Sequence, residues 1–334
     1  MKVLVTGGAG YIGAITASAL ERAGHTPVIL DSLLSGPAAF VTGRHFYRGD
    51  IADRGLLRRI VDEHTDIGAT IHLAARVVVT ESLARPYEYY RDNVARSLEL
   101  FDELQRLGKP RLIFSSSASV YAPTEKFEVS ENSPIGPQSP YARSKRMTEL
   151  IVEDLAAAGE LCALILRYFN PIGSDPDLRF GMYVREPSHV LGQLVLAAHG
   201  QRDAFPITGT DYPTRDGTGL RDYIHVWDLA LAHVAAVEQF DAVLERSAAA
   251  TAIVNLGTGR GVTVRELVAA VETVLGRSVP TREAPRRAGD AVGAYANVDR
   301  AREWLGWSTQ YSLLDGVASA LAWAERRESV LGYP

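Results

Sequence analysis

A tyrosine and a lysine, Tyr141 and Lys145, stand four positions apart in the segment PYARSKRM. The residues that follow have helical periodicity, so both side chains are expected on one face of a helix. A phenol is a poor base at neutral pH, because lowering its pKa by about 3 units takes about 4 kcal/mol. A neighbouring ammonium has the charge that favours the phenolate. The pair therefore predicts proton abstraction by Tyr141; the alternative is an ordinary exposed pair on a helix surface.

Three hydroxyls favour the catalytic interpretation. Ser115, Ser116 and Ser117 follow the apolar run RLIF, which predicts a strand of a sheet. In doubly wound folds, ligands bind at the carboxyl ends of such strands. A serine at that edge can hydrogen-bond a substrate hydroxyl while the tyrosine removes its proton.

Spaced glycines predict a nucleotide site. The segment VTGGAGYIG follows the first expected strand and places Gly7, Gly10 and Gly13 at intervals of three. Glycines let a pyrophosphate approach the backbone at the positive end of the next helix. Asp31 ends the second expected strand, where a carboxylate binds the adenosine ribose and repels a 2′-phosphate, which favours NAD over NADP. Asp50, in RGDIAD, is expected near the adenine.

The elements that position these residues alternate along the first half of the chain. Helices are expected at residues 53–64 and 87–108, between strands at KVLV, TPVIL, HFYRGD, ATIHLAA, RLIFSSS and CALILRY. This alternation predicts an α/β fold, a doubly wound parallel (Rossmann) sheet covered on both faces.

The pattern changes after Pro171, where a loop region rich in proline and glycine leads to further helices and to isolated strands such as AIVNLG. We expect an NAD-binding Rossmann domain in residues 1–170. A smaller, partly interleaved substrate domain is expected in residues 171–334, with the segment near 218–240 returning to the first domain.

The composition limits the classes of partner. The chain has 334 residues, 46% of them hydrophobic, and a formal net charge of -5, which argues against nucleic acid as the main partner. No stretch reaches the roughly 18 apolar residues that a membrane span needs, and the N-terminus has no signal-peptide pattern. The one cysteine, Cys162, cannot form an internal disulfide, so we expect a cytoplasmic protein. The histidines are too isolated to predict a metal site.

Taken together, these motifs resemble those of the extended short-chain dehydrogenase/reductase family, and specifically of its UDP-glucose 4-epimerase (UDP-galactose 4-epimerase) group. The resemblance covers essentially the whole chain. It rests on the segments GGAGYIG, LAARVVVTES, FSSSASVY, PYARSK, LRYFNPIG, DYPTRDGTGLRDYIHVWDLA, NLGTG and RRAGD. The first and fourth mark the superfamily, whereas the sixth is much more specific to the epimerases.

The resemblance implies reversible C4 epimerisation of UDP-glucose and UDP-galactose through a 4-keto intermediate, with transient hydride transfer to tightly bound NAD. In this scheme Tyr141 is the catalytic base, and Lys145 binds the nicotinamide ribose and lowers the pKa of Tyr141. Ser117 holds the sugar 4-hydroxyl. Helices at residues 87–104 and 148–159 would form the two-fold interface of a homodimer, although a buried face within one chain is the alternative.

The same resemblance implies the contact residues. Those for NAD are Gly7, Gly10, Tyr11, Ile12, Gly13, Asp31, Asp50, Ile51, Ala74, Arg76, Asn93, Ser115, Tyr141, Lys145 and Tyr168. Those for the UDP-sugar are Ser117, Tyr141, Asn170, Arg221, Arg287, Asp290 and Ala294. Within this set, Arg221 and Arg287 would bind the diphosphate, because arginine matches phosphate oxygens with a rigid fork. Asp290 would bind the uridine ribose.

Three places depart from the family pattern. The helix after the glycine turn continues with Ala14, Ile15 and Thr16, where relatives often have Ser-His. Asp92 stands where the family usually has asparagine, and Arg76 stands where many bacterial relatives have lysine. A fourth position bears on specificity: Ala294 occupies a site where the family varies and where a bulky side chain narrows the sugar pocket, so we expect UDP-N-acetylhexosamines to be accepted as well. The adjacent Tyr295 is the side chain that would fill this space instead.

Other functions compete with this prediction. An epimerase of pentose or uronate UDP-sugars shares every motif. A nucleotide-sugar 4,6-dehydratase needs Asp-Glu after the strand-end hydroxyl, where this chain has Ala118 and Ser119. A catalytically silent module that binds NAD and a UDP-sugar would have no use for the serine, tyrosine and lysine together.

Overall fold

The computed structural model describes residues 1–286 and 292–333. It confirms the α/β fold, since its largest sheet has seven parallel strands in the order β12-β7-β5-β4-β1-β2-β3. These strands are β1 (Lys2–Thr6), β2 (Thr26–Asp31), β3 (His45–Arg48), β4 (Ile67–His72), β5 (Arg111–Ser115), β7 (Cys162–Tyr168) and β12 (Thr251–Leu256). The middle residues of β1, β5 and β7 are buried, as expected for a parallel sheet with two covered faces.

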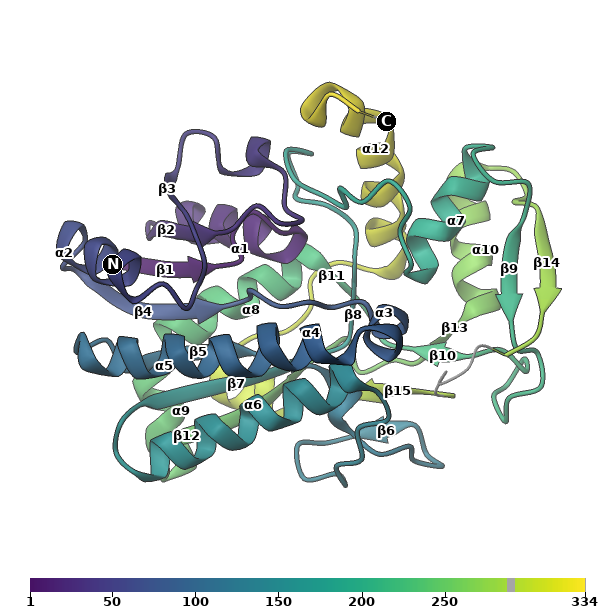
Figure 1. Ribbon diagram of the computed structural model, residues 1–334. Coiled ribbons are helices and arrows are strands. Elements are labelled where there is room, and N and C mark those ends of the chain that lie inside the picture. Colours follow the sequence, from purple (N-terminus) through teal and green to yellow (C-terminus); the bar gives the residue numbers. More distant parts are fainter. Residues whose placement is uncertain (287–291, 334) are drawn as a thin grey trace.

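Helices cover both faces of this sheet. One face packs against α1 (Tyr11–Arg22), α8 (Val226–Glu238), α9 (Phe240–Ser247) and α11 (Asp299–Leu305). The other packs against α2 (Arg54–Glu63), α5 (Arg96–Arg106) and α6 (Pro140–Ala157). Figure 1 shows α5 and α6 side by side on that second face. The carboxyl ends of the strands stay uncovered by these helices and are followed by the loops that hold the candidate site.

One strand of the sheet comes from the second half of the chain. The sequence pattern indicates an isolated strand at AIVNLG, and this prediction is wrong, because β12 pairs in parallel with β7 over its whole length. Without this pairing, the buried strand β7 would be an edge strand with unpaired backbone groups. Hydrophobic periodicity does not reveal which strands are neighbours, and here the neighbours lie far apart in the sequence.

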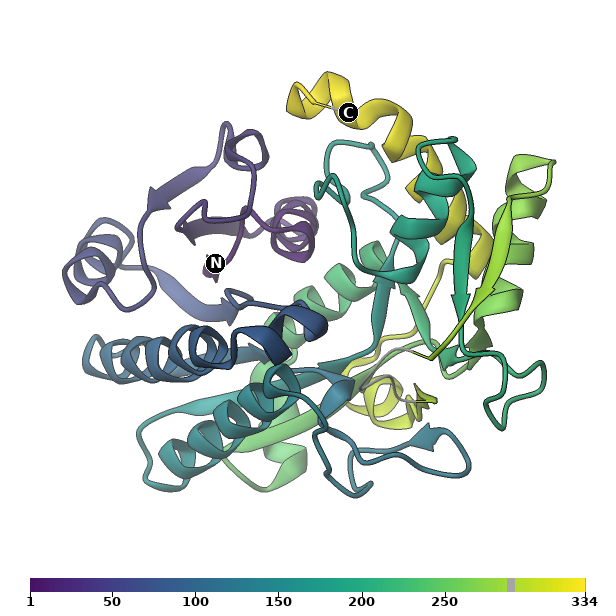
Figure 2. The same ribbon diagram turned by 45° about the vertical axis from the view of Figure 1, so that its right-hand side comes forward.

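A second group of elements lies on the side to which β1 points (Figure 1). It contains a four-stranded sheet, β13-β10-β15-β6, and the strand pairs β11-β8 and β14-β9. The bounds are β6 (Glu128–Val129), β8 (Asn170–Ile172), β9 (Phe205–Thr208), β10 (Leu220–Arg221), β11 (Tyr223–His225), β13 (Val262–Thr263), β14 (Thr281–Ala284), β15 (Gly293–Ala296), α7 (Val190–Ala198), α10 (Val264–Leu275) and α12 (Leu313–Leu331). Figure 2 shows α7, α10, β9 and β14 as a lobe beside the large sheet.

A π-helical turn interrupts the helix expected at residues 87–108. The chain forms α4 (Pro86–Tyr90), then the π turn η2 (Arg91–Ala95), and then α5. Such turns are rare and occur frequently at functional sites. Shorter elements nearby are η1 (Ala38–Val41), α3 (Val79–Ala84) and η3 (Ala118–Val120). Among the helices described here, none is long and apolar enough to cross a membrane.

Candidate active site

The glycine turn between β1 and α1 is shaped for close backbone contact. Gly7 has φ +74°, and a Cβ there would lie 2.6 Å from the backbone nitrogen of Ala74. A Cβ on Gly13 would lie 2.2 Å from the carbonyl oxygen of Gly7. Gly10 is the N-cap of α1, so the free N–H groups of the helix begin directly after it. This bare turn at a helix N-terminus fits a dinucleotide pyrophosphate.

Asp31 connects this turn to the next loop. Its carboxylate accepts hydrogen bonds from the backbone N–H of Ala9 at 2.9 Å and of Leu33 at 2.8 Å. Burial raises the pKa of Asp31, and the two backbone hydrogen bonds oppose this effect. The aspartate therefore lies beside the glycine turn, where the ribose contact is expected.

The remaining predicted NAD residues lie along the same edge. Asp50 follows β3 and pairs with Arg96 at 2.8 Å, and its neighbour Ile51 is buried. Ala74 follows β4 and touches the glycine turn through its backbone. In α1, Ile12 is partly buried and packs against the core, and Tyr11 donates a hydrogen bond to the carbonyl oxygen of Gly173 at 2.7 Å. Tyr11 thus joins the nucleotide half of the chain to the second half.

The catalytic helix α6 begins at this edge. Ser139 caps it by accepting a hydrogen bond from the N–H of Ala142, and Pro140 occupies the first turn, where the missing N–H costs nothing. Tyr141 and Lys145 follow on its buried side. Lys145 Nζ donates to the carbonyl oxygen of Ser115 at 2.8 Å. The structure therefore brings the predicted lysine to the predicted serine strand.

The sequence predicts a lowered pKa for Tyr141, but in the structure its pKa shifts in the opposite direction. Burial raises the pKa of Tyr141, and its hydrogen bond with Ser117 only partly offsets the rise. Burial also lowers the pKa of Lys145 to about 8, while nearby Glu149 favours the charged form. The protein's own groups thus leave Tyr141 protonated at neutral pH, because desolvation outweighs the stabilisation of the phenolate.

A buried ion pair beneath the serines escapes sequence reasoning. Glu149, one turn after Lys145, is fully buried and accepts two hydrogen bonds from Arg167 of β7, both at 2.8 Å. It also accepts a hydrogen bond from Ser116 Oγ at 2.5 Å. Arg167 is 2% exposed. The available signal was an arginine within the otherwise apolar run CALILRY, because arginine is almost never buried without a partner.

Further side chains lie beside Ser115 or hold the helix α6. His233 of α8 lies 3.2 Å from Ser115 Oγ, and its other ring nitrogen is 2.8 Å from the carbonyl oxygen of Leu229. Tyr168 ends β7 with its ring 6.2 Å from that of His233. Asn93, in the π turn, donates to Ser144 Oγ of α6 at 3.0 Å. Each of these contacts fixes an element that carries a predicted site residue.

On the substrate side, three predicted residues are described. Asn170 begins β8 and is exposed. Arg221 of β10 is the register partner of Ala294 in β15, and its Nη1 donates to the carbonyl oxygen of Val292 at 3.0 Å. The predictions for Arg287 and Asp290 lie outside the described residues. The buried Asp222, which sequence reasoning missed, accepts backbone hydrogen bonds from Thr258, Gly259 and Ala296.

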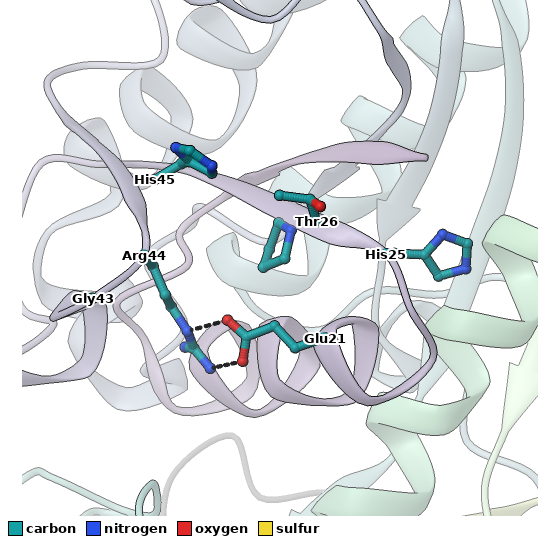
Figure 3. A pocket seen from close by; sticks show the side chains of 7 residues that line it. Glu21, His25, Thr26, Gly43, Arg44 and His45 are labelled. Carbon is teal, nitrogen blue, oxygen red and sulfur yellow. Dashed lines mark hydrogen bonds and ion pairs between the residues drawn. The ribbon is translucent and has the colours of Figure 1, made fainter.

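A separate hollow of about 430 Å³ lies away from this edge (Figure 3). It is lined by residues at the amino ends of β2 and β3, including Thr26 and His45. Its Arg44 is paired with Glu21 through two hydrogen bonds of 2.8 and 3.0 Å. None of the predicted catalytic residues lines it, so the candidate site is the carboxyl edge.

Comparison with known proteins agrees with this geometry. The NAD dependent epimerase/dehydratase family matches residues 3–257. A UDP-glucose 4-epimerase of Azospirillum brasilense is 42% identical over 333 residues, which cover 99% of this chain and 94% of that protein. The UDP-glucose 4-epimerase of Bacillus subtilis (strain 168) is 39% identical over 343 residues, covering 100% of this chain and 99% of that protein.

Solved structures of the same kind superimpose closely. The crystal structure of the UDP-glucose-4-epimerase from Stenotrophomonas maltophila, with bound NAD and formylated UDP-arabinopyranose, has a TM-score of 0.93 at 38% identity, covering 98% of this chain and 99% of that one. The enzyme from Bifidobacterium longum, in complex with NAD+ and UDP, has a TM-score of 0.91 at 33% identity, covering 99% and 100%. This chain therefore belongs to the NAD dependent epimerase/dehydratase family and, within it, to the UDP-glucose 4-epimerases.

Proposed function

We propose that this chain reversibly inverts C4 of UDP-glucose and UDP-galactose, using the contact residues given above. The observation that carries the proposal is the convergence of Ser117, Tyr141 and Lys145 at the carboxyl edge of the sheet, on which the glycine turn also lies. When bound, NAD supplies a reversible hydride acceptor for C4 and, through its cationic nicotinamide ring, positive charge beside the phenol. That charge has the sign needed to offset the burial of Tyr141.

The side chains supply the proton chemistry and the positioning. Tyr141 accepts the proton of the 4-hydroxyl as the sugar becomes a 4-keto sugar. After the sugar has rotated within the site, Tyr141 returns the proton to the same oxygen. Ser117 holds that oxygen within reach of the phenol. Arg221, together with Arg287, holds the diphosphate, so the hexose alone turns between the two half-reactions. The cycle consumes no net proton.

The test is to incubate the purified protein, without added cofactor, with UDP-galactose and to follow C4 by proton NMR. Conversion to UDP-glucose without net NADH is expected. If neither this sugar nor UDP-glucose reacts after NAD is added, the second candidate is a UDP-pentose, since the Stenotrophomonas enzyme was crystallised with formylated UDP-arabinopyranose. Binding of NAD and UDP without turnover of any UDP-sugar would indicate a silent binding module.

We further propose that UDP-N-acetylhexosamines are substrates. Ala294 and Arg221 are register partners in parallel strands, so their side chains leave the same face of the sheet. Ala294 and Ala118 border one apolar cluster, and Ala118 directly follows Ser117. Tyr295 leaves the opposite face by strand alternation, which argues against its filling the space beside Ala294. Ala294 therefore presents only a methyl group on the face that it shares with Arg221.

Replacing Ala294 by tyrosine is expected to lower kcat/KM for UDP-N-acetylgalactosamine about 100-fold, because a bulky ring takes the space of the N-acetyl group. The value for UDP-galactose should change less than about 5-fold. The matched control is Tyr295→Phe, which should leave the ratio of the two substrates unchanged. Equal loss on both substrates in Ala294→Tyr would refute a role in selecting the sugar.

A homodimer is also proposed. Leu98 of α5 and Met147 and Leu150 of α6 are 41%, 46% and 44% exposed, so the neighbouring helices share apolar surface. The double variant Met147→Glu, Leu150→Glu is expected to be a monomer in light scattering, whereas Val274→Glu on α10 should stay a dimer. A wild-type monomer at micromolar concentration would contradict the proposal.

The domain division and the compartment are proposed on simpler grounds. Residues 1–170 with the segment near 218–240 form the NAD-binding domain, which is supported by the packing of α8 against α1, and β12 (Thr251–Leu256) is added to it because it pairs with β7. The rest of residues 171–334 forms the UDP-sugar-binding domain. A cytoplasmic location is supported by the single cysteine, Cys162; fractionation of cells that express a tagged chain tests it.

A further inference from the structure

Four arginines and four carboxylates form a network of ion pairs beside the expected NAD site. The arginines are Arg76, Arg85, Arg91 and Arg96, and the carboxylates are Asp50, Glu81, Glu88 and Asp92. Opposite charges are therefore present in equal number. The cluster extends from the loop after β3, through the loop after β4, to the π turn.

Asp92 lies at the centre of this cluster. It accepts hydrogen bonds from Arg76 Nε at 2.6 Å and Arg91 Nε at 2.7 Å, and lies 3.3 Å from Arg96 Nη1. Its side chain is 11% exposed. Burial works to raise the pKa of Asp92, but the bonds from Arg91 and Arg76 outweigh it and hold the pKa below its usual range. The carboxylate is thus charged and directed at three cations.

Through Arg76 and Arg96, Asp92 connects two of the loops that follow the carboxyl ends of the strands. Arg76 belongs to the loop after β4, and its guanidinium also pairs with Glu88 at 3.0 Å. Arg96 pairs with Asp50, in the loop after β3, at 2.8 Å. Both Asp50 and Arg76 are expected NAD contacts. Asp92 therefore connects two loops that would hold the same cofactor.

The π turn connects this cluster to the catalytic helix. Asn93, the neighbour of Asp92, accepts a hydrogen bond from the N–H of Arg76 at 2.8 Å and donates to Ser144 of α6. Thr148, also of α6, donates to the carbonyl oxygen of Asn93 at 3.0 Å. Asp92 is thus held by the same helix that carries Tyr141. Two of the departures from the family pattern, Asp92 and Arg76, thus meet in one ion pair.

We propose that Asp92 is a positioning residue for NAD: it fixes the Asp50 and Arg76 loops relative to each other and thereby slows release of the cofactor. This inference rests on the proposed NAD site. An asparagine at position 92 can still accept a hydrogen bond from one arginine, but it carries no charge to hold three of them.

The test compares the holoenzyme of Asp92→Asn with that of Asp102→Asn. Asp102 lies in α5, farther along the same interrupted helix, and pairs with Arg54 of α2 at 2.5 Å, so it is matched in chemistry but lies outside the cluster. Release of NAD after dilution is followed by rapid gel filtration and quantification of bound NAD. Asp92→Asn is expected to release NAD about 10-fold faster than wild type, the effect of losing one charged hydrogen bond. Asp102→Asn should release NAD at a rate within about 2-fold of that of wild type.

Salt gives a second readout that does not depend on a variant. Partly exposed ion pairs are screened, so raising NaCl from about 50 mM to about 500 mM should speed NAD release from wild type. The same change should have a smaller effect on Asp92→Asn, because part of the screened interaction is already lost. If Asp92→Asn fails to fold, Arg96→Gln, at a 37% exposed side chain, removes the link between Asp92 and Asp50, leaves the Asp92–Arg76 pair in place, and should also speed release.

Three outcomes separate the possibilities. If Asp92→Asn releases NAD no faster than Asp102→Asn, the ion pairs stabilise this part of the surface without affecting NAD release, and the inference is wrong. Slower release would mean that Asp92 withholds Arg76 from the cofactor, which reverses the proposed direction. A wild-type protein that binds no NAD at all would overturn the proposed function instead.

Discussion

Tyr141→Phe is expected to lower kcat for the conversion of UDP-galactose to UDP-glucose about 1000-fold, the middle of the range for a general acid–base residue. Phenylalanine keeps the buried ring and its edge contact with Tyr89, whose ring centre is 6.5 Å away. The variant should therefore fold and bind NAD, but it has no oxygen to accept and return the proton of the 4-hydroxyl. The measurement is the initial rate by proton NMR, normalised to bound NAD.

The matched control is Tyr89→Phe. This variant also removes one buried phenol oxygen, which donates to the carbonyl oxygen of Val78 at 2.6 Å. The same oxygen accepts a hydrogen bond from the N–H of Val78 at 3.0 Å. The variant is expected to change kcat less than about 5-fold and to lower the free energy of unfolding by about 2 kcal/mol, the value of two hydrogen bonds. A rate for Tyr141→Phe within tenfold of wild type would show that another group takes the proton.

The second large effect is on stability. Glu149→Gln is expected to lower the free energy of unfolding by about 3 to 5 kcal/mol, because Arg167 is left as a buried charge without its counter-ion. The double replacement Glu149→Met, Arg167→Met should recover most of this loss, since neither member of the pair then remains as a buried charge without its partner. Urea unfolding of the NAD-free proteins gives the comparison.

Glu153→Gln is the control for this measurement. Glu153 lies one turn farther along α6 and pairs with Arg146 at 2.9 Å, and its side chain is 32% exposed. An exposed pair of this kind contributes less than about 1 kcal/mol. If Glu149→Gln and Glu153→Gln unfold at the same urea concentration, Arg167 is solvated in solution and the buried pair does not stabilise the fold.

The features that are predictable from the sequence rest on short-range patterns. A Cβ on Gly13 has no room beside Gly7 and Gly8, so that constraint acts within a few residues, and Gly7 itself has φ +74°, which favours glycine. Tyr141 and Lys145 share a helix face because of their spacing, and a Ser-Pro pair marks the start of that helix. Strand β7 is visible as a continuous apolar run. Each of these features is determined by neighbours a few residues away.

The features that were missed depend on contacts between distant segments. Asp92 and Arg76 were singled out in the sequence one by one, but their ion pair was not predicted, since they are 16 residues apart and only the fold brings them within 2.6 Å. The π turn adds one residue to a helix whose apolar periodicity stays nearly regular, so the pattern predicts an uninterrupted helix. The pKa of Tyr141 was predicted from the sign of its neighbours, whereas burial, which needs the packed structure, decides its direction.

The position of β12 also bears on how the chain is made. Strand β7 is complete when Tyr168 leaves the ribosome, but its second neighbour, β12, ends only at Leu256. Until then the nascent chain carries an apolar strand with one open edge, which is a template for pairing with other chains. A fragment that stops near residue 170 would keep that edge permanently, so the nucleotide half cannot be excised as a soluble piece by cutting there.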